Sequence, residues 1–444
     1  MKVQDRVDLE NLKKAVWPLT GAKKDYDPLL ERIGDCNFAL LGEASHGTHE
    51  FYRQRAEITE RLITEKNFTA VAVEADWPDA YRVNRFVRGE PGDAEAVEAL
   101  SGFKRFPTWM WRNADVLDFV GWLRHHNDLL PPGKIRAGFY GLDLYSLHES
   151  ISAVLQYLEK VDPEAARRAR YRYSCFDHFG EDVQRYGYAA EFGLTRSCEN
   201  EVIEQLVELR KKAVELSERN GLPDDELFFA EQNALVIKNA EEYYRKMFRD
   251  RISSWNLRDR HMTQTLEALF NHLKRRDGHA KIVVWAHNSH LGDARATELG
   301  RKGEWNVGQL ARERYGRDAI LVGFTTYTGT VTAASDWNSP AEQKRVRPAL
   351  PDSYEALFHG LAIPDFLLTV TDGASPTVEI PRPLLERAIG VVYLPDIERV
   401  SHYFYADLAR QFDSILHFDV TRGVEPLERN PEWESPVWEA FPWG

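Results

Sequence analysis

The chain is poor in cysteine and methionine and has no long apolar run. It contains three cysteines and four methionines in 444 residues. Cys36, Cys175 and Cys198 are odd in number, lie far apart and show no CxxC spacing, so we predict plain core or surface thiols. No apolar run approaches the roughly 20 residues of a membrane span, and residues 1–19 lack the apolar core of a signal peptide. We therefore expect a cytoplasmic protein without a membrane partner.

An excess of positive charge is also missing. The sequence has 57 Lys and Arg against 70 Asp and Glu, which gives a formal charge of -13. Such a charge repels phosphate backbones and anionic membranes, so we expect a small-molecule partner and no nucleic acid. Hydrophobic residues make up 43% of the chain and charged residues 29%, which is typical of a globular protein.

Short apolar runs bounded by glycine or polar residues recur along the chain. They cover residues 37–42, 68–75, 135–142, 281–288, 319–324 and 389–394. Their continuous apolar character is typical of strands covered on both faces of a parallel sheet. Residues 49–66 and 115–126, between the early runs, repeat apolar side chains at helical spacing. The alternation predicts an α/β fold with a central, mainly parallel sheet and helices on both faces.

The strand pattern stops in the middle of the chain. Residues 202–216 and 226–248 predict two long helices there. The simplest division has two parts of an α/β core, residues 1–146 and 276–444, separated by a helical insertion at 147–275. The insertion either covers the site as a lid or pads the sheet, and the sequence leaves both readings and the oligomeric state open.

Ionisable residues follow four of the predicted strands. In open parallel sheets ligands bind outside the carboxyl ends of the strands, where loops converge. A single polar residue there is most often a cap, but four strands with such residues indicate a site. The residues are Glu43, His46, Glu74, Asp76, Asp143, His287 and His290.

Arg55 adds to this pattern from the helix predicted at 49–66. It lies four residues after Phe51 and three before Ile58, on the inward stripe of that helix. A buried guanidinium needs a carboxylate partner, since an unpaired buried charge costs roughly 3 to 5 kcal/mol. Glu43 and Glu74 are the expected partners, although an inert structural ion pair is the alternative reading.

Several kinds of chemistry are compatible with these residues. Ser45 lacks the Gly-x-Ser-x-Gly spacing of a nucleophile elbow. The spacings His46-x-x-His49 and His287-x-x-His290 match zinc ligands, but HExxH is absent, so zinc is a minority alternative and we expect no cofactor. A water molecule activated by a histidine is the favoured chemistry, with a second imidazole or the arginine stabilising the oxyanion. A binding protein without turnover stays open as a third reading.

Eight sequence blocks resemble the erythromycin esterase family. They appear in the family's order and span roughly residues 37 to 424: "GEASHGTHEFYRQR", "VAVEADWPDAYRVNRFVRG", "FPTWMWRN", "GFYGLDLYSLHES", "NLRDRHM", "WAHNSHLGD", "NVGQL" and "IERVSHYFYADLARQFDSILHFD". The resemblance implies an α/β fold with a helical portion over a deep cleft, and hydrolysis of a macrolactone ester by water without a covalent intermediate.

The resemblance also assigns roles to residues. The family's general base falls on His46, its supporting glutamates on Glu43 and Glu74, its arginine on Arg55 and its second histidine on His287. Further pocket candidates in the matching blocks are His290, Arg258, Asp143, Arg112 and Asp76. The same motifs occur in family members of unknown substrate, so a non-macrolide ester, lactone or acylated sugar is the alternative to a macrolide.

Overall fold

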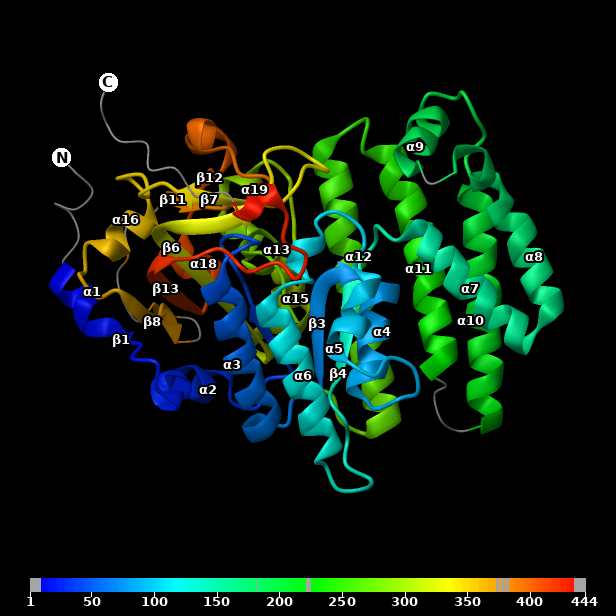
Figure 1. The fold of residues 1–444 in the computed structure, drawn as a ribbon, viewed down its shortest axis with the longest axis horizontal. Helices are drawn as coiled ribbons and strands as arrows, with labels where there is room; N and C mark the ends of the chain where they lie inside the picture. The colour runs from blue at the N-terminus through cyan, green and yellow to red at the C-terminus, as the bar shows by residue number, and fades with distance from the viewer. Residues whose placement is uncertain are drawn as a thin grey trace.

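The apolar runs of the sequence become neighbouring strands of one sheet. The computed structural model describes residues 9–180, 182–220, 225–372, 375–376, 380 and 383–434. The sheet has the order β1-β8-β13-β6-β2-β5-β3-β4, with β7 paired to β6 (Figure 1). Its strands are β1 (Val16–Pro18), β2 (Phe38–Leu41), β3 (Ala70–Asp76), β4 (Gly138–Asp143), β5 (Ile282–Trp285), β6 (Ala319–Ala333), β7 (Glu342–Val346), β8 (Asp365–Thr369) and β13 (Ser414–Thr421).

The sheet is mainly parallel, as predicted. Strands β13, β6, β2, β5, β3 and β4 run in the same direction, whereas β8, β1 and β7 are antiparallel to their neighbours. Two small antiparallel pairs lie outside it, formed by β9 (Thr371–Asp372) with β10 (Ser375–Pro376) and by β11 (Leu384–Arg387) with β12 (Tyr403–Ala406). The parallel strands are buried on both faces, which explains their continuous apolar sequences.

One predicted strand is wrong, and several strands were missed, among them β13 in the parallel part of the sheet. Residues 389–394 make only isolated bridges, from Ile389 to Ser45 and from Val392 to Ala334. The apolar side chains of this segment pack against β6 and β7 instead of extending the sheet. Strand β13 pairs with β6 in the sheet. Its sequence did not match the pattern of a buried strand, because His417 interrupts the run of apolar residues.

Helices cover both faces of the sheet. One core cluster joins the sheet to α2, α3 and α6, and the other joins the opposite face to α12, α15 and α16. The helices outside the central stretch are α1 (Leu9–Ala15), α2 (Asp27–Ile33), α3 (His49–Lys66), α4 (Trp77–Val87), α5 (Ala96–Ala99), α6 (Ala114–Asp128), α13 (Asn288–Leu291), α14 (Glu298–Arg301), α15 (Val307–Tyr315), α16 (Tyr354–His359), α17 (Glu398–Ser401), α18 (Leu408–Gln411) and α19 (Pro431–Glu434).

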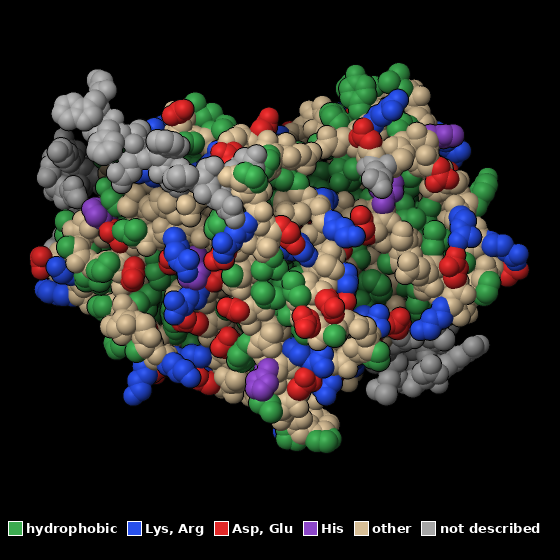
Figure 2. Space-filling model, in the orientation of Figure 1, with side chains coloured by type: hydrophobic (Ala, Val, Ile, Leu, Met, Phe, Trp, Pro, Cys, Tyr) green, Lys and Arg blue, Asp and Glu red, His purple; other side chains and the backbone are tan. Residues whose placement is uncertain are grey.

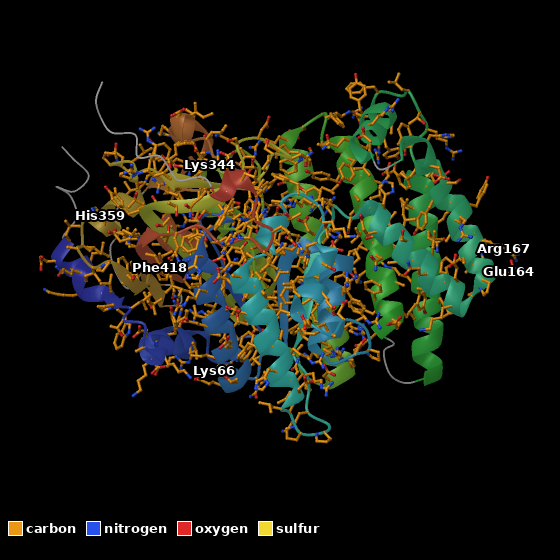
Figure 3. The ribbon with its side chains drawn as sticks, viewed as in Figure 1. Lys66, Glu164, Arg167, Lys344, His359 and Phe418 are labelled. Carbon is orange, nitrogen blue, oxygen red and sulfur yellow. A yellow bond between two sulfur atoms is a disulfide. The ribbon has the colours of Figure 1, made fainter. Side chains whose placement is uncertain are left out.

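Between β4 and β5 the described residues form helices as their only regular secondary structure. The stretch comprises α7 (Leu147–Val161), α8 (Pro163–Tyr173), α9 (Val183–Glu191), α10 (Glu199–Asn220), α11 (Asp225–Lys246) and α12 (Arg251–Asp277). Helices α7 to α11 form a block at one end of the molecule with an apolar cluster of their own, and α12 lies against the sheet (Figure 1). Glu164 and Arg167 point away from the sheet at the outer edge of this block (Figure 3). The division into core and insertion stays a prediction.

The prediction of three free thiols is wrong for two of them. Cys175 and Cys198 form a disulfide with their Cα atoms 6.0 Å apart. They are 23 residues apart in sequence and carry no motif, because helix packing inside the helical block brings them together. Cys36 is free and half-buried, and burial raises the pKa of its thiol.

Two glycines allow the close approach of backbone segments beside the first strand. A Cβ atom at Gly47 would lie 1.8 Å from the carbonyl oxygen of Thr332, at the end of β6. A Cβ atom at Gly42 would lie 2.2 Å from Oδ1 of Asn288, in the segment after β5. The glycines of "LLGEASHG" therefore let three strand ends meet without a clash.

The surface facing the viewer in Figure 2 mixes Lys and Arg with Asp and Glu. Within the described ranges, no helix has both the length and the apolar character that crossing a membrane requires.

Candidate active site

The ionisable residues that follow the strands meet at one edge of the sheet. Glu43 and His46 follow β2, Glu74 and Asp76 lie at the carboxyl end of β3, and Asp143 is the last residue of β4. His287 follows β5 and caps the short helix α13, which carries His290. Because these strands are parallel, their carboxyl ends point to the same side of the sheet. All seven side chains are buried.

Glu43 joins His46 to Arg55. Its Oε1 lies 2.9 Å from Nδ1 of His46, and its Oε2 accepts a 2.8 Å hydrogen bond from Nη2 of Arg55. A carboxylate only accepts hydrogen bonds, so when the ring of His46 is neutral its proton lies on Nδ1 and its Nε2 is the acceptor. This Nε2 lies 4.0 Å from Oε1 of Glu74.

Arg55 lies behind this pair and away from the cavity. Its side chain is 0% exposed and stacks over the rings of Tyr52 and Trp285, at 4.4 and 5.2 Å from their centroids. The inward position predicted for Arg55 on α3 is confirmed. The guanidinium does not line the cavity described below, so it holds Glu43 in place rather than contacting a substrate.

Glu74 lies at the centre of the charged network. Its Oε1 accepts a 2.7 Å hydrogen bond from Nη2 of Arg258, and its Oε2 accepts a 2.9 Å hydrogen bond from the backbone N–H of His287. Burial alone would raise the pKa of Glu74, but the charges of His290 and Arg258 outweigh it and hold that pKa well below the usual range. Glu74 is therefore ionised at neutral pH.

His290 is the positive partner of this network. Burial alone would lower its pKa, but Asp259 and Glu74 raise the pKa of His290 to about 9. Its Nδ1 donates to Asp259 at 2.9 Å, and its Nε2 faces Glu74 at 3.3 Å. Arg258 lies 3.0 Å from the same Nε2 and donates to Asp143 at 2.7 Å. With His290 protonated both groups are cations, and the three carboxylates around them balance their charge.

His287 differs from His290 in its protonation. Burial and the nearby His46 lower the pKa of His287 to about 3, so its ring is neutral. The backbone N–H of Ser289 donates to its Nδ1 at 3.2 Å, which places the remaining proton on Nε2. The His287 and His46 rings lie 4.9 Å apart between centroids. Nε2 of His287 is buried and has no hydrogen-bond partner in the described part of the chain.

A cavity of about 200 Å³ opens beside His46. Its ionisable lining comes from His46, Glu74, Asp76, Asp79, Asp143, Arg105 and Arg258, and its apolar lining includes Phe103, Phe106, Met110, Trp111, Tyr145, Trp337 and Val391. Asp76 accepts a 2.8 Å hydrogen bond from Arg105. Arg112 does not line this cavity and pairs with Glu428.

The sequence reasoning missed Arg105, Asp79 and Asp259. Asp259 directly follows Arg258 in the block "NLRDRHM", which was the one signal for it. Asp79 lies one helical turn after Asp76, whereas Arg105 comes from a loop without any pattern. Across the described residues, no three His, Cys, Asp or Glu side chains are grouped in a way that would hold a metal ion.

These features define a class: an α/β protein with a histidine-carboxylate-arginine site at the carboxyl edge of its sheet. Residues 63–421 match the family model described as erythromycin esterase. The chain belongs to the erythromycin esterase family, and it is accordingly a hydrolase of that family.

One curated relative and two solved structures are similar to this chain. The erythromycin esterase type II of Escherichia coli is 22% identical over 326 residues, which cover 70% of this chain and 73% of that protein. A crystal structure of a succinoglycan biosynthesis protein superposes with a TM-score of 0.74 at 20% identity, covering 94% of this chain and 97% of that one. A histidine-to-asparagine mutant of erythromycin esterase EreC in its open conformation gives a TM-score of 0.64 at 17% identity, with 90% and 94% covered. The predicted α/β fold is confirmed.

Proposed function

We propose that this protein hydrolyses a carboxylic ester or lactone by direct attack of a water molecule that His46 activates. The observation that carries the proposal is the Glu43–His46 pair, which leaves Nε2 of His46 as a free base beside the cavity. The alternative nucleophile Ser45 forms its hydrogen bond with Thr48. This contact supports water as the attacking group.

The proposed reaction has two steps. Water attacks the carbonyl carbon while its proton moves to Nε2 of His46, and the ester C–O bond then breaks as that proton passes to the leaving alcohol. Glu43 stabilises the imidazolium that forms in between, and Arg55 positions Glu43. Such general-base assistance contributes roughly 100- to 10,000-fold in rate.

Arg258 is the proposed stabiliser of the oxyanion. The sequence favoured a second imidazole, His287, or Arg55 for this role. Arg258 and Arg105 both line the cavity, and Arg258 is the one that contacts Glu74, whereas Arg55 lies behind Glu43. A positive group at the site of developing negative charge stabilises the transition state more than the substrate. We propose that the reaction needs no metal, so that dialysis against a chelator leaves the rate unchanged.

The size of the cavity favours a second candidate substrate over a macrolide. Pockets for drug-sized ligands measure roughly 300 to 1,000 Å³. The cavity beside His46 is about 200 Å³ and is lined by charged groups. A small ester, a small lactone or the acyl group of an acylated sugar therefore fits this conformation better than a 14-membered macrolide does.

Hydrolysis assays with a matched pair of variants test the proposal. The purified protein is incubated with p-nitrophenyl esters, a small lactone and a 14-membered macrolide, and ring opening is read as a mass gain of one water. We expect turnover of at least one ester and its loss by 100-fold or more in His46→Asn. The control His125→Asn alters an exposed histidine of α6 and should keep full activity.

Each result has a definite reading. A mass gain with the macrolide assigns macrolide esterase activity, whereas turnover of small esters alone assigns the second candidate. A folded His46→Asn protein with full activity would refute the role of His46. Tight ligand binding without any product would favour a binding protein.

A further inference from the structure

The carboxylates that line the cavity beside His46 are not equally paired. Glu74 and Asp143 both accept hydrogen bonds from Arg258. Asp76 accepts from Arg105 through Oδ2 only, and its Oδ1 is buried without a hydrogen-bond partner in the described part of the chain. Asp76 as a whole is 5% exposed. The cavity therefore contains a buried, unused acceptor next to the reacting groups.

Asp79 is the second carboxyl group with unused acceptors. It lies in the first turn of α4, three residues after Asp76, which is the N-cap residue of that helix, and both residues line the cavity. Among the residues that the structure describes, no side chain or backbone group forms a hydrogen bond or ion pair with the carboxyl group of Asp79. It also lines a larger groove of about 900 Å³ between α4 and α7, so it stands where the two spaces adjoin.

The electrostatic surroundings of Asp79 lack a compensating cation. Burial, Asp76 and Glu149 raise the pKa of Asp79 to about 8, while Arg105 and Arg82 oppose the shift. Arg105 and Arg82 are themselves paired, with Asp76 and Asp93 respectively. A positive group brought in by a ligand would restore the charge of Asp79.

Aromatic rings complete the wall around these carboxyl groups. The cavity is lined by Phe103, Phe106, Trp111, Tyr145 and Trp337. The rings of Phe106 and Trp337 lie 5.1 Å apart at 61°, and Trp337 is 52% exposed, so this pair forms an open rim. Aromatic faces beside a carboxylate are the usual surroundings of bound alkylammonium groups.

We propose that Asp76 and Asp79, together with the aromatic rim, bind an organic ammonium group of the substrate and thereby place its ester next to His46. The second part of this statement rests on the proposed function, whereas ammonium binding does not. A metal cation fits less well, because no three metal-binding side chains are grouped among the described residues and the rim is aromatic.

Binding of choline tests the proposal directly. Its uncharged isostere, 3,3-dimethyl-1-butanol, has the same shape and hydroxyl group without the charge. Calorimetric titration of the His46→Asn protein, which should not turn over an ester, separates binding from catalysis. We expect choline to bind at least tenfold more tightly than the isostere, and Asp79→Asn to remove this preference. The control Asp118→Asn removes one exposed carboxylate from α6 and should keep the preference.

The pH dependence of choline binding gives a second test. It is measured in the His46→Asn protein that keeps Asp79. Choline keeps its charge at every pH, so the part of the pH dependence that Asp79→Asn removes reports the ionisation of Asp79. With a pKa of about 8 in the free protein, Asp79 is about 10% ionised at pH 7 and about 90% at pH 9. The dissociation constant of choline should therefore fall by about tenfold between these values.

Equal binding of choline and its isostere would overturn the proposal, as would a preference that survives in folded Asp79→Asn. A dissociation constant that does not change between pH 7 and pH 9 would remove Asp79 from the site. Hydrolysis of acetylcholine and 3,3-dimethylbutyl acetate then tests the link to catalysis, with a KM at least tenfold lower for the charged ester. If choline binds as expected but neither ester is hydrolysed, the ammonium site stands and the esterase assignment fails for these esters.

Discussion

Removal of the Arg55 guanidinium should destabilise the protein measurably. Arg55 is fully buried and pairs with Glu43, which is 1% exposed. Loss of one partner from a buried ion pair costs roughly 3 to 5 kcal/mol. Nε and Nη1 of Arg55 are buried without hydrogen-bond partners in the described part of the chain, and their removal offsets part of that cost. We therefore expect Arg55→Met, which keeps the apolar length of the side chain, to lose about 3 kcal/mol.

Urea unfolding followed by tryptophan fluorescence measures this loss. The matched control is Arg53→Met, two residues earlier on α3, whose side chain is 59% exposed and pairs with Glu57 at 2.9 Å. Exposed pairs of this kind contribute about 0 to 1 kcal/mol. If Arg55→Met is no more destabilising than Arg53→Met, the buried pair does not stabilise the fold and the reasoning fails.

A double variant separates stability from catalysis. Adding Glu43→Gln to Arg55→Met removes the lone buried charge, so about 1 to 2 kcal/mol of the lost stability should return. Hydrolysis should stay low in the same protein, because the neutral amide cannot stabilise the imidazolium of His46. Recovery of the rate together with the stability would show that Glu43 acts only as a structural partner of Arg55.

Two further predictions follow from the geometry of the site. His290 has a raised pKa of about 9, so its contribution to stability is complete below the unfolded pKa of about 6.5 and is lost as pH rises through about 9. His290→Gln should therefore flatten the pH dependence of the free energy of unfolding between these two values, by up to about 3 kcal/mol. An unchanged pH profile would contradict the charged state of His290. Gly47→Ala should destabilise the protein by about 1 to 3 kcal/mol or more in thermal unfolding, because the added Cβ would lie 1.8 Å from the Thr332 carbonyl oxygen. The control Gly121→Ala adds a Cβ in open space on α6, so it should be neutral or stabilising.

Local sequence patterns were sufficient for five of the six parallel strands and for the ionisable residues that directly follow them. Strands buried on both faces carry continuous apolar runs, so β2, β3, β4, β5 and β6 were visible in the sequence. The residues after those strands could be read as one group, because parallel strands end at the same edge. Arg55 was identified by its position on the apolar stripe of α3.

Patterns failed where an apolar run had another cause. Residues 389–394 are apolar because they pack across the ends of β6 and β7, and β13 was hidden because His417 and Asp419 interrupt its run. The Cys175–Cys198 disulfide likewise joins segments whose proximity depends on helix packing. Periodicity reports which side of an element is buried, but it does not report what covers that side.

The sequence by itself determined which ionisable groups follow the parallel strands and therefore share one edge of the sheet, since the pattern predicts the direction of those strands. Only the tertiary structure decided how they pair. Arg258 and Asp259 come from α12, more than 100 residues after Asp143 in the chain, and they determine that Glu74 is ionised and His290 protonated. Charge in a buried site depends on distances of a few ångströms between segments far apart in sequence. Those distances cannot be predicted from the local sequence around each residue.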